Sequence, residues 1–352
     1  MARLRSSESS VPSCSRMRPV TSPARRLLST AALSILCGKR MKYNQLGSTG
    51  IEVSALTIGA WQLGGPLFFD GKPDGHPDPG KENVIRMIHE LGDLGINAID
   101  TAEQYSAGES ERRVGEALKG QRDRWVISSK FGYRVGEGGT RIDDSSPPTI
   151  LPSLEGSLKR LDTDYVDVYL YHCAPETGHL EEGREILERA KAAGKIRAYG
   201  VSTGDFKLLD TMVKAGNVEV VQFPVSLLDP ASEAWKIARA NQLGTQLRGV
   251  MAQGRLSGKY FHKKPQFASD DNRSNWCADE DYSKFAVLAE CLPEGMTMAQ
   301  AAIKWILDRP GAHTICMGAK NIEDYRSAIA AVEMPALGAE VRSRLEFMAQ
   351  SL

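Results

Sequence analysis

The chain has 352 residues, of which 41% are apolar, and its 44 basic and 44 acidic residues cancel to a formal net charge of zero. This balance argues against nucleic acid or a membrane surface as the main partner. The six cysteines are scattered without a CxxC pair and the six histidines form no HxH or HExxH spacing, so no metal site is expected.

Residues 1–40 differ from the rest because they carry eight Lys or Arg side chains and one acid, Glu8. This Arg- and Ser-rich stretch is predicted to be a disordered N-terminal extension or a targeting segment. Three alternatives stay open: an organellar transit peptide, an export signal in which Arg25-Arg26 precede an apolar run, or an upstream extension with the start at Met41. The apolar run is too short to span a membrane, and a cytoplasmic location is expected.

From residue 53 onward, short apolar runs alternate with amphipathic stretches. The runs predicted as strands are 54–60, 97–102, 125–130, 166–172, 198–202, 219–223, 245–250 and 313–317. The predicted helices are a first one in which Val84, Ile88 and Leu91 share a face, and others near 109–118, 149–161, 181–193, 206–215, 231–242, 297–308 and 322–331. Eight strands alternating with helices over about 300 residues predict an α/β protein, a (β/α)8 TIM barrel in residues 41–352.

A doubly wound sheet is the structural rival of the barrel. It would bind a dinucleotide through a GxGxxG loop after its first strand, and no such motif follows 54–60. Residues 44–55 are predicted to form a β-hairpin at the barrel bottom, because Gly47-Ser48-Thr49-Gly50 is a turn signal. The long segment 255–295 after the seventh strand is expected at the catalytic face, with a helix around 280–291.

Four polar residues lie at the ends of predicted strands or just after them. Asp100, Lys130 and His172 close three of the apolar runs, and Tyr105 follows Asp100 in the next loop. The C-terminal ends of parallel barrel strands meet at one face, which is where such barrels do their chemistry. A Tyr supported by a Lys, an Asp and a His suits proton donation to a carbonyl oxygen, so the sequence predicts reduction of an aldehyde or ketone.

Each of these side chains has an expected task. Negative charge builds on a carbonyl oxygen as hydride adds to the carbon, and Tyr105 is the expected general acid that protonates this oxygen. The Lys130 ammonium is expected to bring the pKa of Tyr105 down toward neutral pH. Asp100 is expected to keep Lys130 charged and oriented, and His172 to hydrogen-bond the carbonyl oxygen.

Several blocks of the sequence, in order, resemble the aldo-keto reductase family. The first runs from Gly95 to Tyr105 and continues through Gly108-Glu109-Ser110-Glu111; later blocks are 157–172, 194–202, 221–222, 252–260 and 318–321. Their order and spacing are more specific than any single block, and the resemblance covers about residues 42–350. It implies a TIM barrel that uses a nicotinamide dinucleotide without a metal, with NADPH preferred and NADH possible.

The same resemblance implies which residues hold the nicotinamide. Ser202 and Gln222 match family positions that bind the carboxamide, and Thr203 stands where the family usually has Asn. Arg248 takes the place of an aromatic residue that usually packs on the nicotinamide ring. A guanidinium plane can also stack on a ring, although it changes the electrostatics there.

The expected phosphate and adenosine contacts come from two later segments. They are the backbone around Gly254, Leu256, Gly258 and Lys259, then Gly318, Lys320 and Asp324. The helix that starts at Asn321 offers free N–H groups to phosphate. Lys320 is expected near a 2′-phosphate, whereas the Asp324 carboxylate near the ribose favours a 2′-hydroxyl.

Trp61 and Phe131 are the expected walls of the substrate pocket, because one ends the first strand and the other follows Lys130. The partner is then a small-molecule carbonyl compound, and the sequence leaves the oligomeric state open. The alternative function is a cofactor-binding regulatory subunit with little turnover. The altered positions Thr203, Arg248 and Asp324 keep that alternative open, because they line the expected cofactor site.

Overall fold

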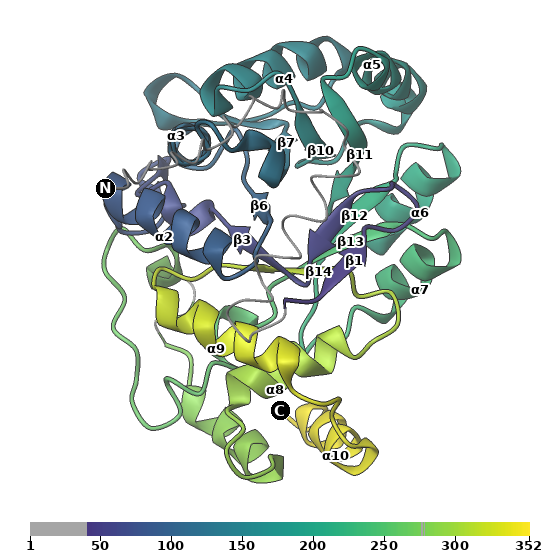
Figure 1. The fold of residues 1–352 in the computed structure, drawn as a ribbon. Helices are drawn as coiled ribbons and strands as arrows, with labels where there is room; N and C mark the ends of the chain where they lie inside the picture. The colour runs from purple at the N-terminus through teal and green to yellow at the C-terminus, as the bar shows by residue number, and fades with distance from the viewer. Residues whose placement is uncertain (1–40, 276, 278) are drawn as a thin grey trace, which may run out of the picture.

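The computed structural model describes residues 41–352 except 276 and 278. The predicted targeting segment 1–40 therefore lies outside the described residues. Eight parallel strands close into a barrel (Figure 1). In barrel order they are β3 (Leu56–Gly59), β6 (Ala98–Asp100), β7 (Val126–Phe131), β10 (Val166–Tyr171), β11 (Ile196–Ser202), β12 (Val220–Pro224), β13 (Gly244–Arg248) and β14 (Thr314–Met317). Each lies within two residues of a predicted run, so the predicted TIM barrel is confirmed.

Helices surround the strands on the outside of the barrel (Figure 1). They are α2 (Lys81–Asp93), α3 (Glu109–Ala117), α4 (Pro147–Leu161), α5 (Leu180–Ala192), α6 (Phe206–Lys214), α7 (Ser232–Ala240), α8 (Met298–Leu307), α9 (Ile322–Glu333) and α10 (Ala339–Ala349). Asn321 caps α9 as predicted, because its side chain accepts a hydrogen bond from the Asp324 amide. The sequence interpretation missed α10, which packs against the segment after β13.

The predicted N-terminal hairpin is confirmed. Strands β1 (Tyr43–Gln45) and β2 (Glu52–Ser54) pair antiparallel before the barrel begins. Leu46, Ile51 and Val53 are fully buried and belong to an apolar cluster with inward-facing side chains from several barrel strands, such as Val168. The hairpin therefore closes the end of the barrel at which the strands begin, and it leaves the opposite end to the chemistry.

Two short hairpins that the sequence interpretation missed stand at that opposite end. Strands β4 (Phe68–Phe69) and β5 (Lys72–Pro73) follow β3, while β8 (Tyr133–Val135) and β9 (Arg141–Asp143) follow β7. A backbone hydrogen bond from Asp70 N to Gly139 O joins them. They form a rim beside the carboxyl ends of β3 and β7.

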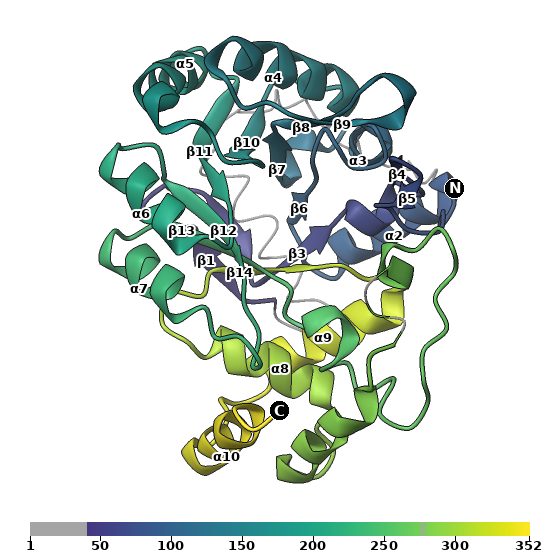
Figure 2. The same cartoon turned by 180° about the vertical axis from the view of Figure 1, so that it is seen from behind.

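The segment between β13 and α8 is the longest excursion from the barrel. Figure 2 shows it running along the outside of the barrel, from the β4–β5 hairpin down to the helical turns beside α10.

The described 3-10 turns are η1 (Trp61–Leu63), η2 (Arg122–Arg124), η3 (Glu137–Gly139), η4 (Thr177–His179), η5 (Ala252–Gly254), η6 (Asn272–Asn275) and η7 (Tyr282–Cys291).

The helix predicted at 280–291 is η7, a 3-10 helix. Its buried residues Tyr282, Phe285, Leu288 and Cys291 recur every third position, which places them on one face of a helix with three residues per turn.

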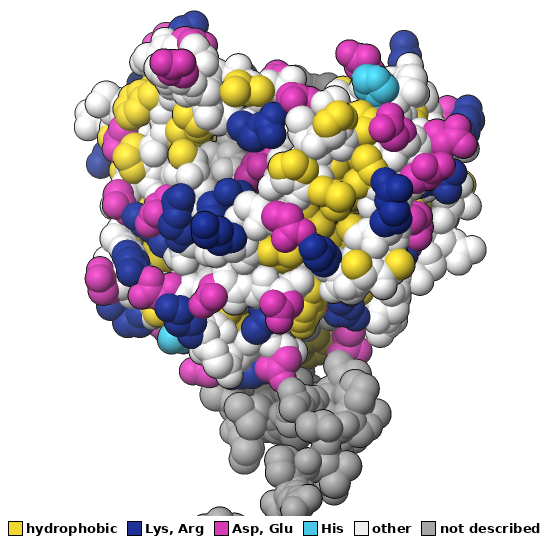
Figure 3. Space-filling model, turned by 90° about the horizontal axis from the view of Figure 1, so that it is seen from above, with side chains coloured by type: hydrophobic (Ala, Val, Ile, Leu, Met, Phe, Trp, Pro, Cys, Tyr) yellow, Lys and Arg dark blue, Asp and Glu magenta, His cyan; other side chains and the backbone are white. Residues whose placement is uncertain are grey.

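The outer surface over α4 and α5 carries basic and acidic side chains that are interspersed (Figure 3). Among the described residues, no helix combines the length and the apolar character that a membrane crossing requires.

Candidate active site

The centre of the site is a buried ion pair between Lys130 and Asp100. The Lys130 Nζ lies 2.7 Å from Asp100 Oδ1, and their side chains are 0% and 7% exposed. The same ammonium donates to the Thr101 carbonyl at 2.9 Å and to the Tyr105 hydroxyl at 3.0 Å. Three of the four predicted residues therefore meet directly.

The backbone of the loop after β6 helps to place the Tyr105 ring. Ser106 and Ala107 both have positive φ values, 51° and 53°, which side-chain-bearing residues rarely adopt. Ser106 is held in this conformation by a hydrogen bond from its hydroxyl to the Gly65 carbonyl. Backbone strain of this kind gathers at functional sites, where surrounding contacts maintain it.

Burial and charge set the protonation states of the pair and of the phenol. Burial alone would lower the pKa of Lys130, but Asp100 and Tyr105 raise it above its ordinary value, so the ammonium stays charged. Burial raises the pKa of Tyr105, and the opposing effect of Lys130 does not cancel this rise. Lys130 lowers this pKa as expected, but the larger effect of burial leaves it above its ordinary value and not near neutral pH. Tyr105 keeps its proton at neutral pH, as a proton donor must.

His172 lies beside Tyr105 at the end of β10. The two rings meet edge to face with 5.7 Å between centroids, and the centroid of the Tyr133 ring lies 4.9 Å from that of the imidazole. Burial, helped by the positive charges of Lys130 and Arg248, holds the pKa of His172 well below its ordinary value. Its Nδ1 is buried without a hydrogen-bond partner among the described residues. A neutral imidazole of this kind can donate a hydrogen bond to a substrate oxygen.

Of the two predicted pocket walls, only Trp61 faces the reacting groups. Its ring stacks on Tyr105 with centroids 6.1 Å apart. Phe131 is fully buried; its ring stacks on Tyr169 with centroids 4.7 Å apart and lies tilted against Tyr171 at 4.6 Å. The prediction for Phe131 is wrong, because neighbouring side chains of a strand point to opposite faces and Lys130 already points into the barrel.

The expected carboxamide residues lie directly beside the ion pair. Ser202 donates to Gln222 Oε1 at 3.0 Å, and Gln222 Nε2 donates to Asp100 Oδ1 at 2.9 Å. Thr203, which replaces the usual Asn, accepts a hydrogen bond on its hydroxyl from the Asp205 amide. Amide and hydroxyl groups are therefore present at the place where the resemblance puts a carboxamide.

The backbone expected to meet phosphate is only partly available. The amides of Gly254 and Leu256 donate to the Met251 carbonyl, so neither is free in this structure. The Lys259 amide donates to Ser257 Oγ. Among the described residues, only the Gly258 amide of these four lacks a hydrogen bond.

The two lysines at the expected adenosine end are each paired with an acid. Asp324 binds Lys259 Nζ with both oxygens, at 2.6 and 2.7 Å. Lys320 lies 3.2 Å from Asp271, a carboxylate on the long segment that is 4% exposed. Asp271 also binds Arg273 at 2.8 Å. Burial alone would raise the pKa of Asp271, but hydrogen bonds from Arg273 and His76, together with the Arg273 charge, hold it far below its ordinary value.

Sequence reasoning missed Gln62, which lies at the same edge of the barrel. Its Oε1 atom is buried and has no hydrogen-bond partner among the described residues. The amide packs against Gly318, where a Cβ would lie 2.0 Å from Gln62 Nε2 and would displace the Gln62 side chain. A buried amide without a partner suits a polar ligand, so the observation fits a dinucleotide at Gly318. A lone Gln in the sequence gave no signal for this role.

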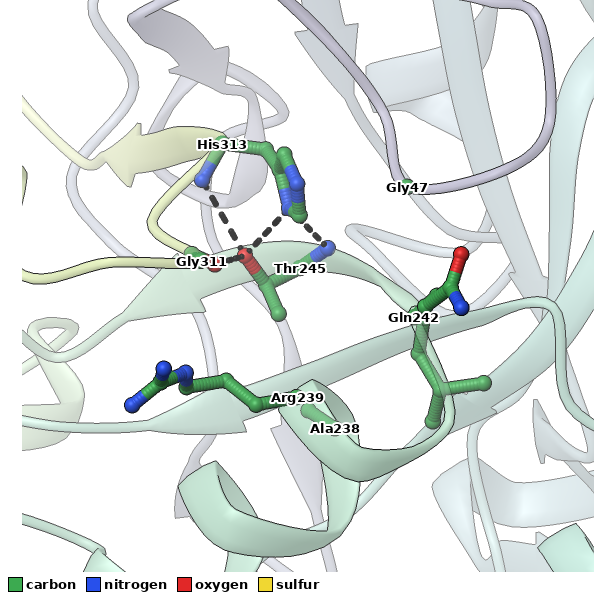
Figure 4. Close-up of a pocket in the computed structure, with 8 residues that line it drawn as sticks. Gly47, Ala238, Arg239, Gln242, Thr245, Gly311 and His313 are labelled. Carbon is green, nitrogen blue, oxygen red and sulfur yellow. Dashed lines mark hydrogen bonds between the residues drawn. The ribbon is translucent and has the colours of Figure 1, made fainter.

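A cavity at the other end of the barrel is remote from these groups. Figure 4 shows its walls, which include Gly47 in the hairpin turn, Arg239 near the end of α7, and Thr245 and His313 near the starts of β13 and β14. Strand starts lie opposite the catalytic face. No cluster of three metal-ligating side chains occurs in the part of the chain that the structure describes.

Comparisons with known proteins agree with this geometry. Residues 55–348 match the model of the Aldo/keto reductase family. Aldo-keto reductase YhdN of Bacillus subtilis (strain 168) is 31% identical over 296 residues, which cover 80% of this chain and 86% of that protein. The NADH-specific methylglyoxal reductase of Escherichia coli (strain K12) is 30% identical over 316 residues, with 84% and 94% covered. The holo form of aldo-keto reductase AKR11C1 from Bacillus halodurans has a TM-score of 0.75 at 28% identity, with 89% and 98% covered.

The ion pair generates a stability prediction. Lys130→Met leaves the Asp100 carboxylate buried without its cation, and we expect the free energy of unfolding to fall by about 3–5 kcal/mol. Adding Asp100→Asn removes the unpaired charge and should recover much of this loss in urea unfolding. Purely additive effects of the two substitutions would contradict a coupled pair.

Proposed function

Because the chain belongs to the aldo/keto reductase family, it is an NAD(P)H-dependent reductase of aldehydes or ketones, and we propose that Tyr105 supplies the proton in this reaction. The observation that carries the proposal is the 3.0 Å hydrogen bond from the buried Lys130 ammonium to the Tyr105 hydroxyl. When Tyr105 gives its proton to the carbonyl oxygen, the phenolate that remains lies against a fixed positive charge. A charge placed in advance stabilises such a product without reorganisation.

His172 and Asp100 act beside Tyr105 in this proposal. The neutral His172 ring donates a hydrogen bond to the same carbonyl oxygen and so orients the substrate. Asp100 keeps Lys130 charged and is a positioning residue. When bound, the reduced dinucleotide supplies the hydride. Ser202, Gln222 and Arg248 would hold its nicotinamide end.

The substrate is proposed to be a small aldehyde or ketone. Trp61, Tyr133 and Tyr105 surround the approach to His172, and aromatic walls with few polar groups suit a small carbonyl compound. The relative named as a methylglyoxal reductase supports a substrate of this size. We also propose that residues 41–352 form the catalytic domain and work in the cytoplasm, where free thiols such as Cys173 and Cys316 stay reduced.

The adenosine end sets the choice between the two coenzymes. Lys259 and Lys320 are the two lysines at the expected adenosine end, and each is already bound to a carboxylate. The Asp324 carboxylate repels a 2′-phosphate and accepts a hydrogen bond from a 2′-hydroxyl. We propose that these pairs weaken the family's preference for NADPH, so that NADH is used as well.

Tyr105→Phe should lower the turnover number by about 10²–10⁴-fold, because the variant lacks the acid proton. The affinity for reduced coenzyme should stay within about twofold of wild type, because the substitution leaves the expected coenzyme contacts unchanged. Steady-state rates and fluorescence titrations measure the two effects. Tyr43→Phe, at the barrel bottom, is the control and should keep wild-type turnover. Full activity in the Tyr105 variant would overturn the assignment.

The pH profile of reduction follows from the two shifted groups. Tyr105 is active as the protonated phenol, and burial raises its pKa, so activity should be lost only above about pH 10. His172 is active as the neutral ring, and burial lowers its pKa, so it stays neutral well below pH 6.5. We expect kcat/KM to be flat from roughly pH 6.5 to 9. A fall within that interval would contradict these protonation states.

Asp324→Gln should raise the preference for NADPH over NADH by roughly three- to tenfold, because it removes a carboxylate next to the expected 2′-phosphate and frees Lys259. Dissociation constants for both coenzymes measure the change. Glu323→Gln is the matched control. It removes the same charge from the residue next to Asp324, and the Glu323 side chain is 78% exposed. An equal shift of the NADPH preference in the two variants would show that the loss of a negative charge, and not the position of Asp324, causes it.

A further inference from the structure

Arg248 lies at the end of β13 and faces the barrel mouth, which is the end of the barrel at which the strands finish. Side chains alternate along a strand, so Arg248 shares a face with Gln246, two residues earlier. Gln246 points into the barrel, where it donates to Ser128 Oγ and accepts from Gln222 Nε2 at 3.3 Å. Arg248 is therefore one layer nearer the mouth than Gln246, above the side chains that bind Asp100. Its backbone is fixed by the hydrogen bond from Val225 N to Arg248 O.

The Arg248 guanidinium is half-buried, and no hydrogen bond or ion pair joins it to another described residue. The Asp100 carboxylate is already shared by Lys130 and Gln222, at 2.7 and 2.9 Å. Arg248 therefore brings a positive charge that no described side chain pairs with directly.

The reach of this charge can be followed on three surrounding groups. The Arg248 guanidinium contributes to lowering the pKa of Tyr105, of His172 and of Cys316, although burial is the largest influence on each of these pKa values. These residues come from β10, from β14 and from the loop after β6. In the register of β12 against β13, Arg248 lies beside Pro224, two residues beyond Gln222 toward the mouth.

We propose that Arg248 discriminates between the two redox forms of the coenzyme, and that its charge disfavours the oxidised nicotinamide ring. The inference rests on the proposed function, because it requires the nicotinamide beside Ser202 and Gln222. The reduced ring is neutral, whereas the oxidised ring carries a positive charge. Like charges held close together in a partly dry site repel. The protein therefore binds NAD(P)H more tightly than NAD(P)+.

An aromatic residue at position 248 would act in the opposite direction. The face of an aromatic ring attracts a cation, so it would stabilise the oxidised nicotinamide relative to the reduced one. Arg248 can stack on the ring as an aromatic would, but with the reverse charge preference.

The test measures dissociation constants of reduced and oxidised coenzyme for the full chain, by tryptophan fluorescence and by calorimetry. The quantity of interest is the ratio of the oxidised to the reduced constant. In Arg248→Gln and in Arg248→Tyr this ratio should fall by about tenfold or more, since both remove the charge and the second keeps a stacking surface. In Arg248→Lys it should stay within about threefold of wild type, because the charge remains. Arg239→Gln, which loses the same charge at the barrel bottom, should leave it unchanged.

An unchanged ratio in both neutral variants would overturn the inference, and so would an equal fall in Arg248→Lys and Arg248→Gln. If Arg248→Gln binds neither form measurably, the Tyr variant decides on the same criterion. The outcome is separable from the proposed function. A wild-type chain that binds NAD(P)H and reduces carbonyls keeps that function whatever the ratio does, whereas a wild-type chain that binds neither form overturns both.

Discussion

The buried ion pair between Lys130 and Asp100 is the constraint on which the rest of the site depends. Removing two charges from water is costly, and the pair persists only because its remaining hydrogen-bonding positions are satisfied. The Lys130 ammonium also donates hydrogen bonds to Thr101 and Tyr105, and Gln222 donates one to the Asp100 carboxylate. The groups of this network come from the ends of three strands, β6, β7 and β12, so the closed barrel is what holds the pair together.

Charge at the mouth is arranged so that reacting groups are neutral and supporting groups are charged. Tyr105 and His172 have pKa values moved in opposite directions by the same burial, and both are uncharged at neutral pH. Lys130 and Arg248 stay positive around them. At the expected adenosine end the pattern reverses, because Lys259 and Lys320 are paired with Asp324 and Asp271. In the proposed binding mode, the coenzyme would meet positive charge at its nicotinamide and carboxylates at its ribose.

The architecture and the reacting groups were predictable because they depend on local pattern. Apolar runs of strand length recur between amphipathic stretches, and polar residues at strand ends must meet in a barrel. The prediction of Phe131 as a pocket wall was wrong, although strand alternation, which turns it away from Lys130, already argued against it. The pKa of Tyr105 was not, because burial outweighs the neighbouring ammonium and burial is known only after folding. The pairing of Lys320 with Asp271 joins residues 49 positions apart, on two irregular segments without periodicity. Likewise η7 follows a three-residue period, and the sequence analysis predicted a helix there without specifying its type.

The central claim is that this charged mouth reduces carbonyls with a bound nicotinamide dinucleotide. Titration of the wild-type full chain with NADH and NADPH, followed by oxidation of the bound coenzyme at about 340 nm against a panel of small aldehydes and ketones, tests it most directly. The account predicts saturable binding of both coenzymes and turnover on at least one small carbonyl compound. Tight binding without turnover on any member of the panel would contradict it, and would leave a cofactor-binding regulatory protein as the better description.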